Sequence, residues 1–195
     1  MISFKQKNKG FTLIEMLISV GIFTVMSGII LANYPEFRSR SALDNLTAQI
    51  AIVFREAQVY GISVREEGAA NFSTGYGVHV DITGENKKQL IIFADRNNDT
   101  IFDKNRDSVL ETFNLTGGET ISELCAPSCV GGTGIRPMYP NSLTAVFVRP
   151  NPDAYFAINE IRNPSMSSIS LKVSNRSGSY SRYVEVYTTG QISVR

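Results

Sequence analysis

Apolar positions follow two different periods along the chain. Residues 11–31 are almost wholly apolar, and across 43–57 apolar side chains recur at three- and four-residue spacing. The first pattern indicates a continuous apolar helix and the second an amphipathic one. Pro35, between them, is predicted to kink or locally melt the helix, and Gly61 is predicted to end it. The first third of the chain is therefore predicted to be one long helix.

After Gly68 the period changes to two, which is typical of strands. In the segment 76–82, for example, Val78, Val80 and Ile82 share one face. Turns are predicted at "NPDA" (151–154) and "TTGQ" (188–191). The predicted strands are 76–82, 89–95, 108–115, 143–150, 154–160, 168–174, 183–189 and 191–195. The predicted fold class is α+β, with a long N-terminal helix packed on a mostly antiparallel β-sheet body.

Charge is distributed unevenly. Of the 19 basic and 18 acidic residues, Lys5, Lys7 and Lys9 lie in the first ten positions, which hold no acid. Without these three lysines the remainder has 16 basic against 18 acidic residues, a net charge of −2. The body therefore lacks the basic footprint of a strong nucleic-acid-binding domain.

The apolar segment 11–31 is long enough to cross a membrane, since a helix of this length extends about 31 Å. The lysines before it predict a cytoplasmic N-terminus, with the rest of the chain on the other side. A cleaved secretory signal with Ala32 at the cut site fits this pattern, and so does an ordinary signal anchor. Neither accounts for Glu15, because a carboxylate in a membrane costs a few kcal/mol.

The stretch "KGFTLIEMLISVGIF" closely resembles the N-terminal signature of type IV pilins and type II secretion pseudopilins. Members of this family have a short basic leader that ends in Gly, followed by Phe, with Glu as the fifth residue of the mature chain. Gly10, Phe11 and Glu15 stand at this spacing. The resemblance implies that prepilin peptidase cuts between Gly10 and Phe11 and that the new amine of Phe11 is N-methylated.

Cleavage would give Glu15 an ion-pair partner, the new amine of Phe11 on a neighbouring subunit. In a filament of staggered helices, the Glu15 carboxylate of one subunit can meet the Phe11 amine of the next, and pairing of this kind offsets desolvation only in good geometry. Glu15 could instead extend to the lipid headgroups. Gly21 and Gly28 either let neighbouring helices approach closely or mark local flexibility.

The resemblance also divides the chain and gives it a role. It implies a cleaved leader (1–10), a transmembrane helix (11–32), an amphipathic continuation of that helix (33–64) and an exported β-rich body (65–195). The body and its final "GQISVR" look like the minor pseudopilins of the H type, and minor type IV pilins share this plan.

The expected function is that of a structural minor subunit of a type II secretion pseudopilus or a type IV pilus. The implied partners are other pilin or pseudopilin subunits, prepilin peptidase, and the assembly platform with its ATPase. The expected location is the bacterial inner membrane, crossed once with the body outside the cytoplasm, and then the filament. Adhesion and DNA uptake are alternative roles, and Arg176, Arg182 and Arg195 form either a small basic cluster for DNA or an ordinary solvated face.

The segment "DRNNDTIFDKNRD" (95–107) fits part of a calcium-loop frame. Its oxygen donors Asp95, Asn97, Asp99 and Asp103 stand at positions 1, 3, 5 and 9, and the carbonyl of Ile101 stands at position 7. Alternating oxygen donors in a turning loop suit a hard cation that takes 6–8 oxygens. Calcium is therefore the candidate cofactor, and no other cofactor is indicated.

Two positions of this loop depart from the frame. Position 6 is Thr100 rather than Gly, and position 12 is Arg106 rather than a bidentate acid. Asp107 or Glu111 could replace that acid only if the loop bulges. A metal-free turn rich in Asp and Asn is the alternative.

Cys125 and Cys129, in "CAPSC", are the two cysteines. In the cytosol they would suggest a metal or redox pair, but two ligands do not make a closed zinc site. Because the predicted topology exports them, a disulfide between Cys125 and Cys129 is expected.

The sequence offers little for catalysis. Its single histidine, His79, lies in the middle of a predicted strand, as a solvent-facing or a structural side chain. There is no glycine-rich phosphate loop and no HExxH zinc motif. We therefore expect that the protein is not an enzyme, and a membrane-anchored exported hydrolase is the rival from another class.

Overall fold

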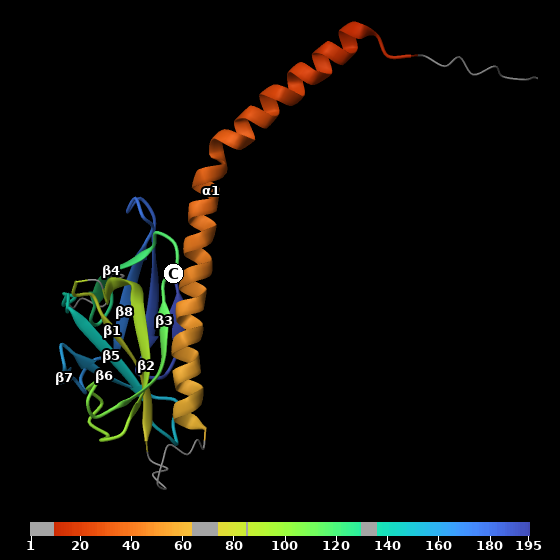
Figure 1. The fold of residues 1–195 in the computed structure, drawn as a ribbon. Coiled ribbons are helices and arrows are strands. Elements are labelled where there is room, and N and C mark those ends of the chain that lie inside the picture. Colours follow the sequence, from red (N-terminus) through yellow and green to blue (C-terminus); the bar gives the residue numbers. More distant parts are fainter. Residues whose placement is uncertain (1–9, 64–73, 85, 130–135) are drawn as a thin grey trace, which may run out of the picture. The chain divides into compact units, whose positions relative to one another are not determined.

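The computed structural model describes residues 10–63, 74–84, 86–129 and 136–195 (Figure 1). The chain divides into two compact units, residues 1–39 and 40–195. The helix α1 (Leu13–Ile62) supplies residues to both units. The elements after it are β1 (Gly75–Asp81), η1 (Asn86–Lys88), β2 (Gln89–Asp95), β3 (Ser108–Asn114), β4 (Thr120–Cys125), β5 (Ser142–Phe147), β6 (Ala154–Ile158), β7 (Ile161–Arg162), β8 (Ser168–Ser174), β9 (Ser181–Tyr187) and β10 (Ile192–Val194).

The first unit is an exposed apolar helix. In the part of the chain that the structure describes, α1 alone is long and apolar enough to cross a membrane, and none of its most apolar 18-residue window is buried. Large apolar side chains there are open to the surroundings, for example Phe23 at 72% and Leu31 at 70% exposure. Such a surface is stable only when lipid or other protein covers it.

Pro35 does not interrupt α1, so the prediction of local melting is wrong. All residues on both sides of it are helical. A proline lacks one backbone donor, which leaves the carbonyl of Leu31 without its usual partner. Only this one hydrogen bond is lost, and the helix continues on both sides of the proline.

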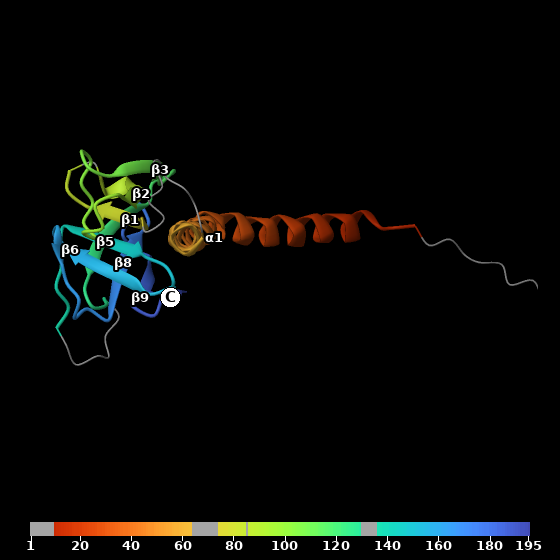
Figure 2. The ribbon, with the colours of Figure 1, turned by 90° about the horizontal axis from the view of Figure 1, so that it is seen from below.

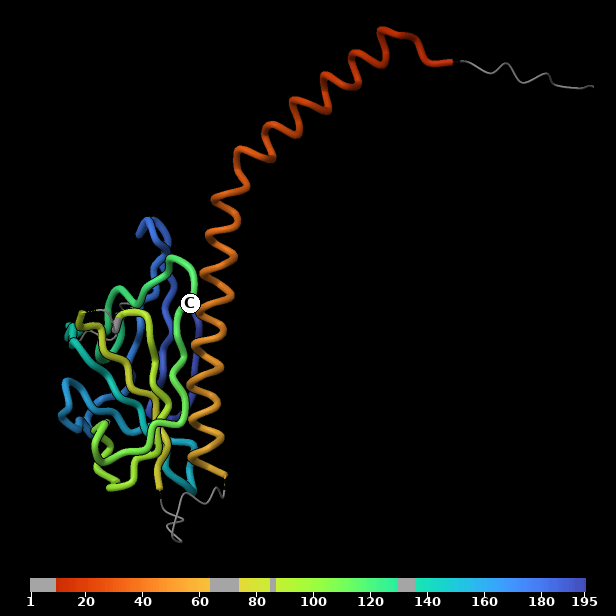
Figure 3. Tube along the Cα trace, viewed as in Figure 1, coloured from red at the N-terminus to blue at the C-terminus, as the bar shows by residue number. Residues whose placement is uncertain are grey.

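In the second unit α1 packs on the β body through one stripe. The buried apolar side chains follow the three- and four-residue spacing that the sequence predicted, whereas Asp44 and Arg55 on the other face are exposed. Figure 3 shows this part of the helix beside the strands. The buried side chains of the stripe are Leu43, Leu46, Ile50, Val53, Phe54 and Ala57.

Two antiparallel sheets form the body. The six-stranded sheet has the order β3-β2-β1-β5-β6-β7, and the four-stranded sheet has the order β10-β9-β8-β4. Each neighbouring pair is antiparallel. The predicted α+β fold class, with a long helix and a mostly antiparallel body, is confirmed.

The eight predicted strands are all present, and the turns at 151–154 and 188–191 join β5 to β6 and β9 to β10 as predicted. Two strands were not predicted. In β4 the pairing with β8 shifts between Ile121 and Glu123, and this bulge breaks the alternation that marks a strand. β7 has two residues, too few to show a period.

One hydrophobic core joins the helix to both sheets. Figure 2 shows the packed part of α1 end-on, beside strands of both sheets. The core contains Ile50 and Phe54 from the helix, Val78 from one sheet, and Leu171 and Val184 from the other. Because α1 supplies so much of this core, the body depends on the C-terminal half of the helix.

The end of α1 lies very close to β5. The helix runs one residue past Gly61, which was predicted to end it. A Cβ atom at Gly61 would lie 2.5 Å from the carbonyl oxygen of Phe147. Next to it, the Gln58 side chain donates to the carbonyls of Pro152 and Gly190, at 3.0 and 2.9 Å. Gly61 is therefore needed for close helix–strand packing.

Replacing Gly61 with Ala should destabilise the body. Alanine normally favours a helix over glycine by about 1 kcal/mol, but the new methyl group would push against backbone, and overpacking typically costs about 1–3 kcal/mol. We expect a net loss of roughly 1 kcal/mol or more, measured by urea denaturation of the full chain in detergent with near-UV circular dichroism. Gly28→Ala, with no atom within 4 Å of the new Cβ, is the control and should leave the midpoint unchanged. An unchanged midpoint for Gly61→Ala would contradict the packing argument.

Candidate functional site

The N-terminal signature lies at the start of α1, where Thr12 caps the helix. The amide of Glu15 donates to Thr12 Oγ1 at 3.3 Å, and the amide of Met16 donates to the Thr12 carbonyl at 3.2 Å. A Thr followed three residues later by Glu has the spacing of a capping box. Sequence reasoning missed Thr12, although this spacing is the signal that would have found it.

The bond between Gly10 and Phe11 lies just before the helix, in a stretch without regular secondary structure. Phe11 is 81% exposed, and no atom lies within 4 Å of a Cβ built at Gly10. An exposed, non-helical bond is accessible to a peptidase. Residues 1–9 of the predicted leader, with its three lysines, lie outside the described residues. Cleavage and N-methylation at Gly10 and Phe11 stay predictions.

Polar side chains within the apolar part of α1 bond to the helix's own backbone. Ser19 Oγ donates to the carbonyl of Glu15, and Thr24 Oγ1 to that of Val20, both at 2.8 Å. Asn33 donates to the carbonyl of Ile29 at 2.9 Å. A helix can enter lipid only if its polar groups are satisfied internally. These hydroxyl and amide groups therefore do not oppose membrane insertion.

The carboxylate of Glu15, unlike these hydroxyl and amide groups, has no hydrogen-bond partner in the described chain. None of the residues that the structure describes donates a hydrogen bond or forms an ion pair with it. No atom lies within 4 Å of a Cβ built at Gly21 or Gly28. This part of the helix thus presents an acid and two small residues outward, which a neighbouring helix can contact.

The loop between β2 and β3 folds over one face of the six-stranded sheet. Its Phe102 stacks on His79, with ring centroids 4.7 Å apart, and packs against Phe93 in a tilted arrangement at 4.9 Å. His79 Nδ1 lies 2.9 Å from the Thr144 hydroxyl oxygen. Of the two roles that the sequence left open for His79, the structure shows the buried structural one.

Asp95 is the innermost acid of this loop. It is 0% exposed, and its Oδ2 accepts a hydrogen bond from the Thr100 amide at 2.9 Å. Its Oδ1 has no hydrogen-bond partner among the described residues. Burial raises the pKa of Asp95 to about 6, with the Asp107 and Asp99 carboxylates adding to the shift.

Asp107 lies near enough to Asp95 for its charge to act on that carboxylate. Its oxygens accept hydrogen bonds from the amides of Asp103 at 2.7 Å and Arg96 at 3.3 Å. Burial raises the pKa of Asp107, and the charges of Asp99 and Asp103 act in the same direction. At this end of the loop the buried side chain is thus Asp107, whereas Arg106 is exposed.

The other predicted ligands lie nearer the surface. Asp99 Oδ1 accepts from the Ile101 amide at 2.8 Å, and Asn97 Nδ2 donates to Asp99 Oδ2 at 2.7 Å. Asp103 accepts from the Asn105 amide and forms an ion pair with Arg106 at 3.4 Å. These local bonds are those of an Asx-rich turn, and they turn Asp103 toward the outer part of the loop.

Thr100 adopts the left-handed backbone conformation that glycine usually has at position 6 of the calcium-loop frame. Its φ is 66°, in the left-handed region that glycine usually occupies. Its amide donates to the buried Asp95, which helps to hold that conformation. The departure at position 6 therefore changes the residue without changing the backbone conformation that the frame requires.

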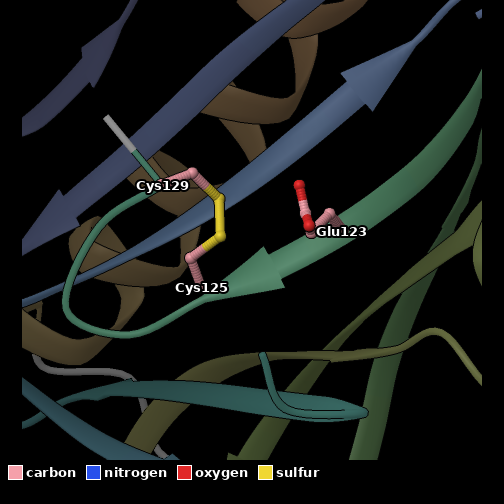
Figure 4. Close-up of side chains that lie close together, drawn as sticks. All are labelled: Glu123, Cys125 and Cys129. Carbon is pink, nitrogen blue, oxygen red and sulfur yellow. A yellow bond between two sulfur atoms is a disulfide. The ribbon is translucent and has the colours of Figure 1, made fainter. Parts of the chain in front are cut away.

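Cys125 and Cys129 form a disulfide in the structure, with Cα atoms 5.2 Å apart. Figure 4 shows Glu123 beside it. One donor atom from each of these three residues lies within 4.8 Å of the others, the single such group in the described part of the chain. Bonded sulfurs are not thiolate ligands, and Glu123 pairs with Lys172 at 3.3 Å. This group is therefore structural.

The disulfide loop is tied to the four-stranded sheet through buried polar groups. The Cys129 amide donates to Ser170 Oγ at 2.7 Å, and Ser128 Oγ donates to the buried carboxylate of Glu185. Glu185 also accepts from Tyr187 at 3.0 Å and lies 3.4 Å from Arg195 Nε. Several partners of this kind make burial of the Glu185 charge tolerable.

Two of the three C-terminal arginines have acidic partners. Arg182 Nε lies 2.6 Å from the Asp44 carboxylate, and Arg195 pairs with Glu185. Arg176 packs against Gly118. The arginines are thus paired or packed, which favours the solvated-face interpretation over a DNA-binding cluster.

Comparison with known proteins agrees with the geometry at the start of α1. Residues 5–31 match the family model of the prokaryotic N-terminal methylation motif. This motif and the long apolar helix that follows it fit the superfamily of type IV pilins and pseudopilins. It is a pilin-like subunit of the kind that prepilin peptidase processes and that assembles with other pilin subunits, and its apolar helix is consistent with membrane anchoring. Searches of curated proteins and of solved structures found no significant match.

The buried histidine should make the pilin-like body sensitive to acid. Burial lowers the pKa of His79 from 6.5 to about 4, so the unfolded chain takes up a proton first as the pH falls. His79 should therefore contribute its full share of stability above pH 6.5 and lose about 3 kcal/mol of it by pH 4.

Urea denaturation of the full chain in detergent between pH 7.5 and 4 tests this prediction. Asp95 and Asp107, whose pKa values are raised, act in the opposite direction, so the informative quantity is the difference between wild type and His79→Asn. That difference should shrink toward low pH. A constant difference across the range would show that His79 does not titrate as its burial implies.

Proposed function

We propose that this chain is a minor subunit of a type II secretion pseudopilus, of the H type, and that a minor type IV pilin is the second candidate. The observation that carries the proposal is the combination of a Gly10–Phe11 junction and Glu15 at the start of an exposed apolar helix. The two-sheet body, closed by the hairpin of β9 and β10, supports the H-type assignment. Minor type IV pilins share this plan, so both candidates need the same N-terminal chemistry.

The subunit would wait in the bacterial inner membrane with its N-terminus in the cytoplasm. Lysines before the apolar segment favour this orientation. Prepilin peptidase would remove residues 1–10, and the amine of Phe11 would then be methylated. An assembly platform and its ATPase would provide the energy to move the subunit into the filament, because leaving the lipid is not favourable for an isolated apolar helix.

Glu15 would select the axial position of each subunit. Its carboxylate has no partner in the described chain and stands four residues after Phe11, whose amine the cleavage would expose. Leaving an ionised group unpaired in an apolar environment costs several kcal/mol, and a well-aligned partner offsets this cost. Only a neighbour at one stagger brings the amine and the carboxylate together, so the pair would favour one register.

We propose that the body binds other proteins and does not catalyse a reaction. His79 lines a cavity of about 220 Å³, but Thr144 engages its Nδ1 and burial lowers its pKa to about 4, which makes it a weak general base near neutral pH. Ser128 lies against Glu185 without a histidine between them, so this pair does not form a catalytic triad. An anchored hydrolase is therefore the weaker proposal.

DNA uptake is also the weaker proposal among filament roles. A DNA-binding surface needs arginines whose charge is not already neutralised. Arg182 and Arg195 each have a carboxylate within 3.4 Å. We therefore expect the body to contact protein, either a secreted substrate or other subunits. Loss of protein secretion after gene deletion, with surface pili retained, would favour the pseudopilus; loss of pili alone would favour the minor pilin.

Replacing Glu15 with Leu should block filament incorporation without blocking membrane insertion. Leucine makes the helix more apolar, so insertion persists, but the neighbour's amine then has no carboxylate to meet. We expect incorporation to fall at least about tenfold, since losing one partner of a buried pair costs about 3–5 kcal/mol. Immunoblots of membrane and sheared-filament fractions measure both quantities, and mass spectrometry of the N-terminus reports leader removal.

Thr24→Leu is the matched control, because it adds an apolar side chain to the same helix and leaves Glu15 in place. This variant should enter filaments normally. If Glu15→Leu also enters them at the wild-type level, the pairing mechanism is wrong. If the wild-type protein keeps its leader in a cell with active peptidase, the filament function itself is wrong.

A further inference from the structure

We propose that the β6–β7 hairpin carries a docking site for an extended acidic segment of a partner protein. Arg162 would pair with a carboxylate of that segment, and two cavities beside Arg162 would each take an apolar side chain. The proposal rests on the protein-binding role proposed above for the body, and it names the chemistry of the partner. Figures 1 and 2 show the hairpin on the side of the body away from α1. A partner can therefore reach it without displacing the packed part of the helix.

The register of the six-stranded sheet places Tyr155 and Arg162 on one face. Tyr155 lies opposite Val146, and Arg162 lies opposite Ala157, two residues further along β6. Residues two apart on a strand share a face, and diagonal neighbours on adjacent strands are within reach of long side chains. The Arg162 guanidinium accordingly lies over the Tyr155 ring, 5.6 Å from its centroid. We call this exposed pair the Tyr155–Arg162 ridge.

The turn of the hairpin fastens the ridge to the neighbouring strand. Asn159 and Glu160 have φ angles of 48° and 63°, as the two central residues of a type I′ hairpin turn require. Asn159 Oδ1 accepts hydrogen bonds from the amides of Asn141 and Ser142, at 2.9 and 3.2 Å, and Ser142 begins β5. A surface that is fixed before binding loses less conformational entropy when a partner docks.

Two cavities adjoin the ridge, and both are lined by Tyr155 and Arg162. The first has a volume of about 310 Å³ and continues to Phe156 and Met166. The second has a volume of about 320 Å³ and continues to Val148. A compact ligand would fill one cavity, whereas an extended chain that crosses the ridge can use both. Alternate side chains of such a chain point the same way, about 7 Å apart.

The charge of Arg162 identifies the group that meets the ridge. Arg162 is exposed and forms no ion pair in the part of the chain that the structure describes. Arg106, Arg182 and Arg195, by contrast, each lie within 3.4 Å of a carboxylate. A guanidinium matches a carboxylate in both charge and geometry, and Arg and Tyr are enriched among the residues that dominate interfaces. The missing partner of Arg162 is therefore a carboxylate.

Two acids of the body exclude further acids from the cavities. Asp153 lines the first cavity and is exposed, and Asp95, which is 0% exposed, lines the second. A second carboxylate of the partner would be repelled in either cavity, where the apolar side chains favour an uncharged group. The site therefore selects one acid on the ridge, with an apolar residue two positions before it and another two positions after it.

Short peptides added to the full chain in detergent test the proposal by amide NMR chemical shifts. The probe is acetyl-Leu-Ser-Glu-Ser-Leu-amide, which has no charged terminus. It should shift the amides of residues 154–156 and 161–163. The same peptide with Gln in place of Glu should bind about five- to tenfold more weakly, because it lacks the charge. Replacing both Leu residues with Ala should weaken binding at least about tenfold.

Arg162→Gln is the decisive variant, and its exposed position makes it compatible with folding. It should bind the Glu and Gln peptides equally. Arg162→Glu should instead prefer a peptide with Lys at the centre, which gives a gain of binding as a readout. Arg176→Gln is the matched control, since Arg176 is an exposed arginine on the turn between β8 and β9. This variant should keep the wild-type preference for the Glu peptide.

Three outcomes would overturn the proposal. Equal binding of the Glu and Gln peptides by the wild-type chain would exclude pairing with Arg162, and preference for the Lys peptide would reverse the chemistry of the partner. Shifts confined to residues outside the hairpin and the cavity walls would place the peptide elsewhere. Failure of this site is distinguishable from failure of the filament role, because Glu15→Leu and the state of the N-terminus test that role separately.

Discussion

The apolar surface of α1 has to be covered along its whole length, and different materials cover its two parts. In the body, Leu43, Ile50 and Phe54 are covered by strands of both sheets. Before residue 40 the chain itself provides no cover, so lipid or neighbouring helices must do so. The other properties of the chain follow from this division. Side chains that contact neighbouring subunits have to lie on the uncovered part. The folded body packs on the covered part.

In the apolar segment 11–31 of this uncovered part, the internal hydrogen bonds and the single carboxylate, Glu15, have opposite effects. Ser19 and Thr24 bond to their own helix, which makes the segment acceptable to lipid. Glu15 has no such partner, so it is the one side chain there whose free energy depends strongly on a neighbour.

In the body, two buried carboxylates, those of Glu185 and Asp95, differ in how many hydrogen-bond and ion-pair partners they have. Glu185 has a serine, a tyrosine and an arginine around it, and this set ties the disulfide loop and the C-terminus to the sheet. Asp95 has one satisfied oxygen and two like charges nearby. The first arrangement is complete within the chain. The second is incomplete among the described residues, because Asp95 Oδ1 has no hydrogen-bond partner there.

Local sequence determined the elements whose signal is local. The three- and four-residue spacing fixed the helix stripe, alternation located eight strands, and the spacing of Gly10, Phe11 and Glu15 identified the family. Tertiary structure decided what depends on distant contacts. A bulge in the pairing with β8 masks the alternation in β4, so the sequence did not predict this strand. The close approach of β5 is the reason that a glycine is needed at position 61. The fold of the β2–β3 loop turned Asp107 inward and Asp103 outward. Periodicity reports which face a residue occupies, whereas only packing between distant segments decides what that face meets.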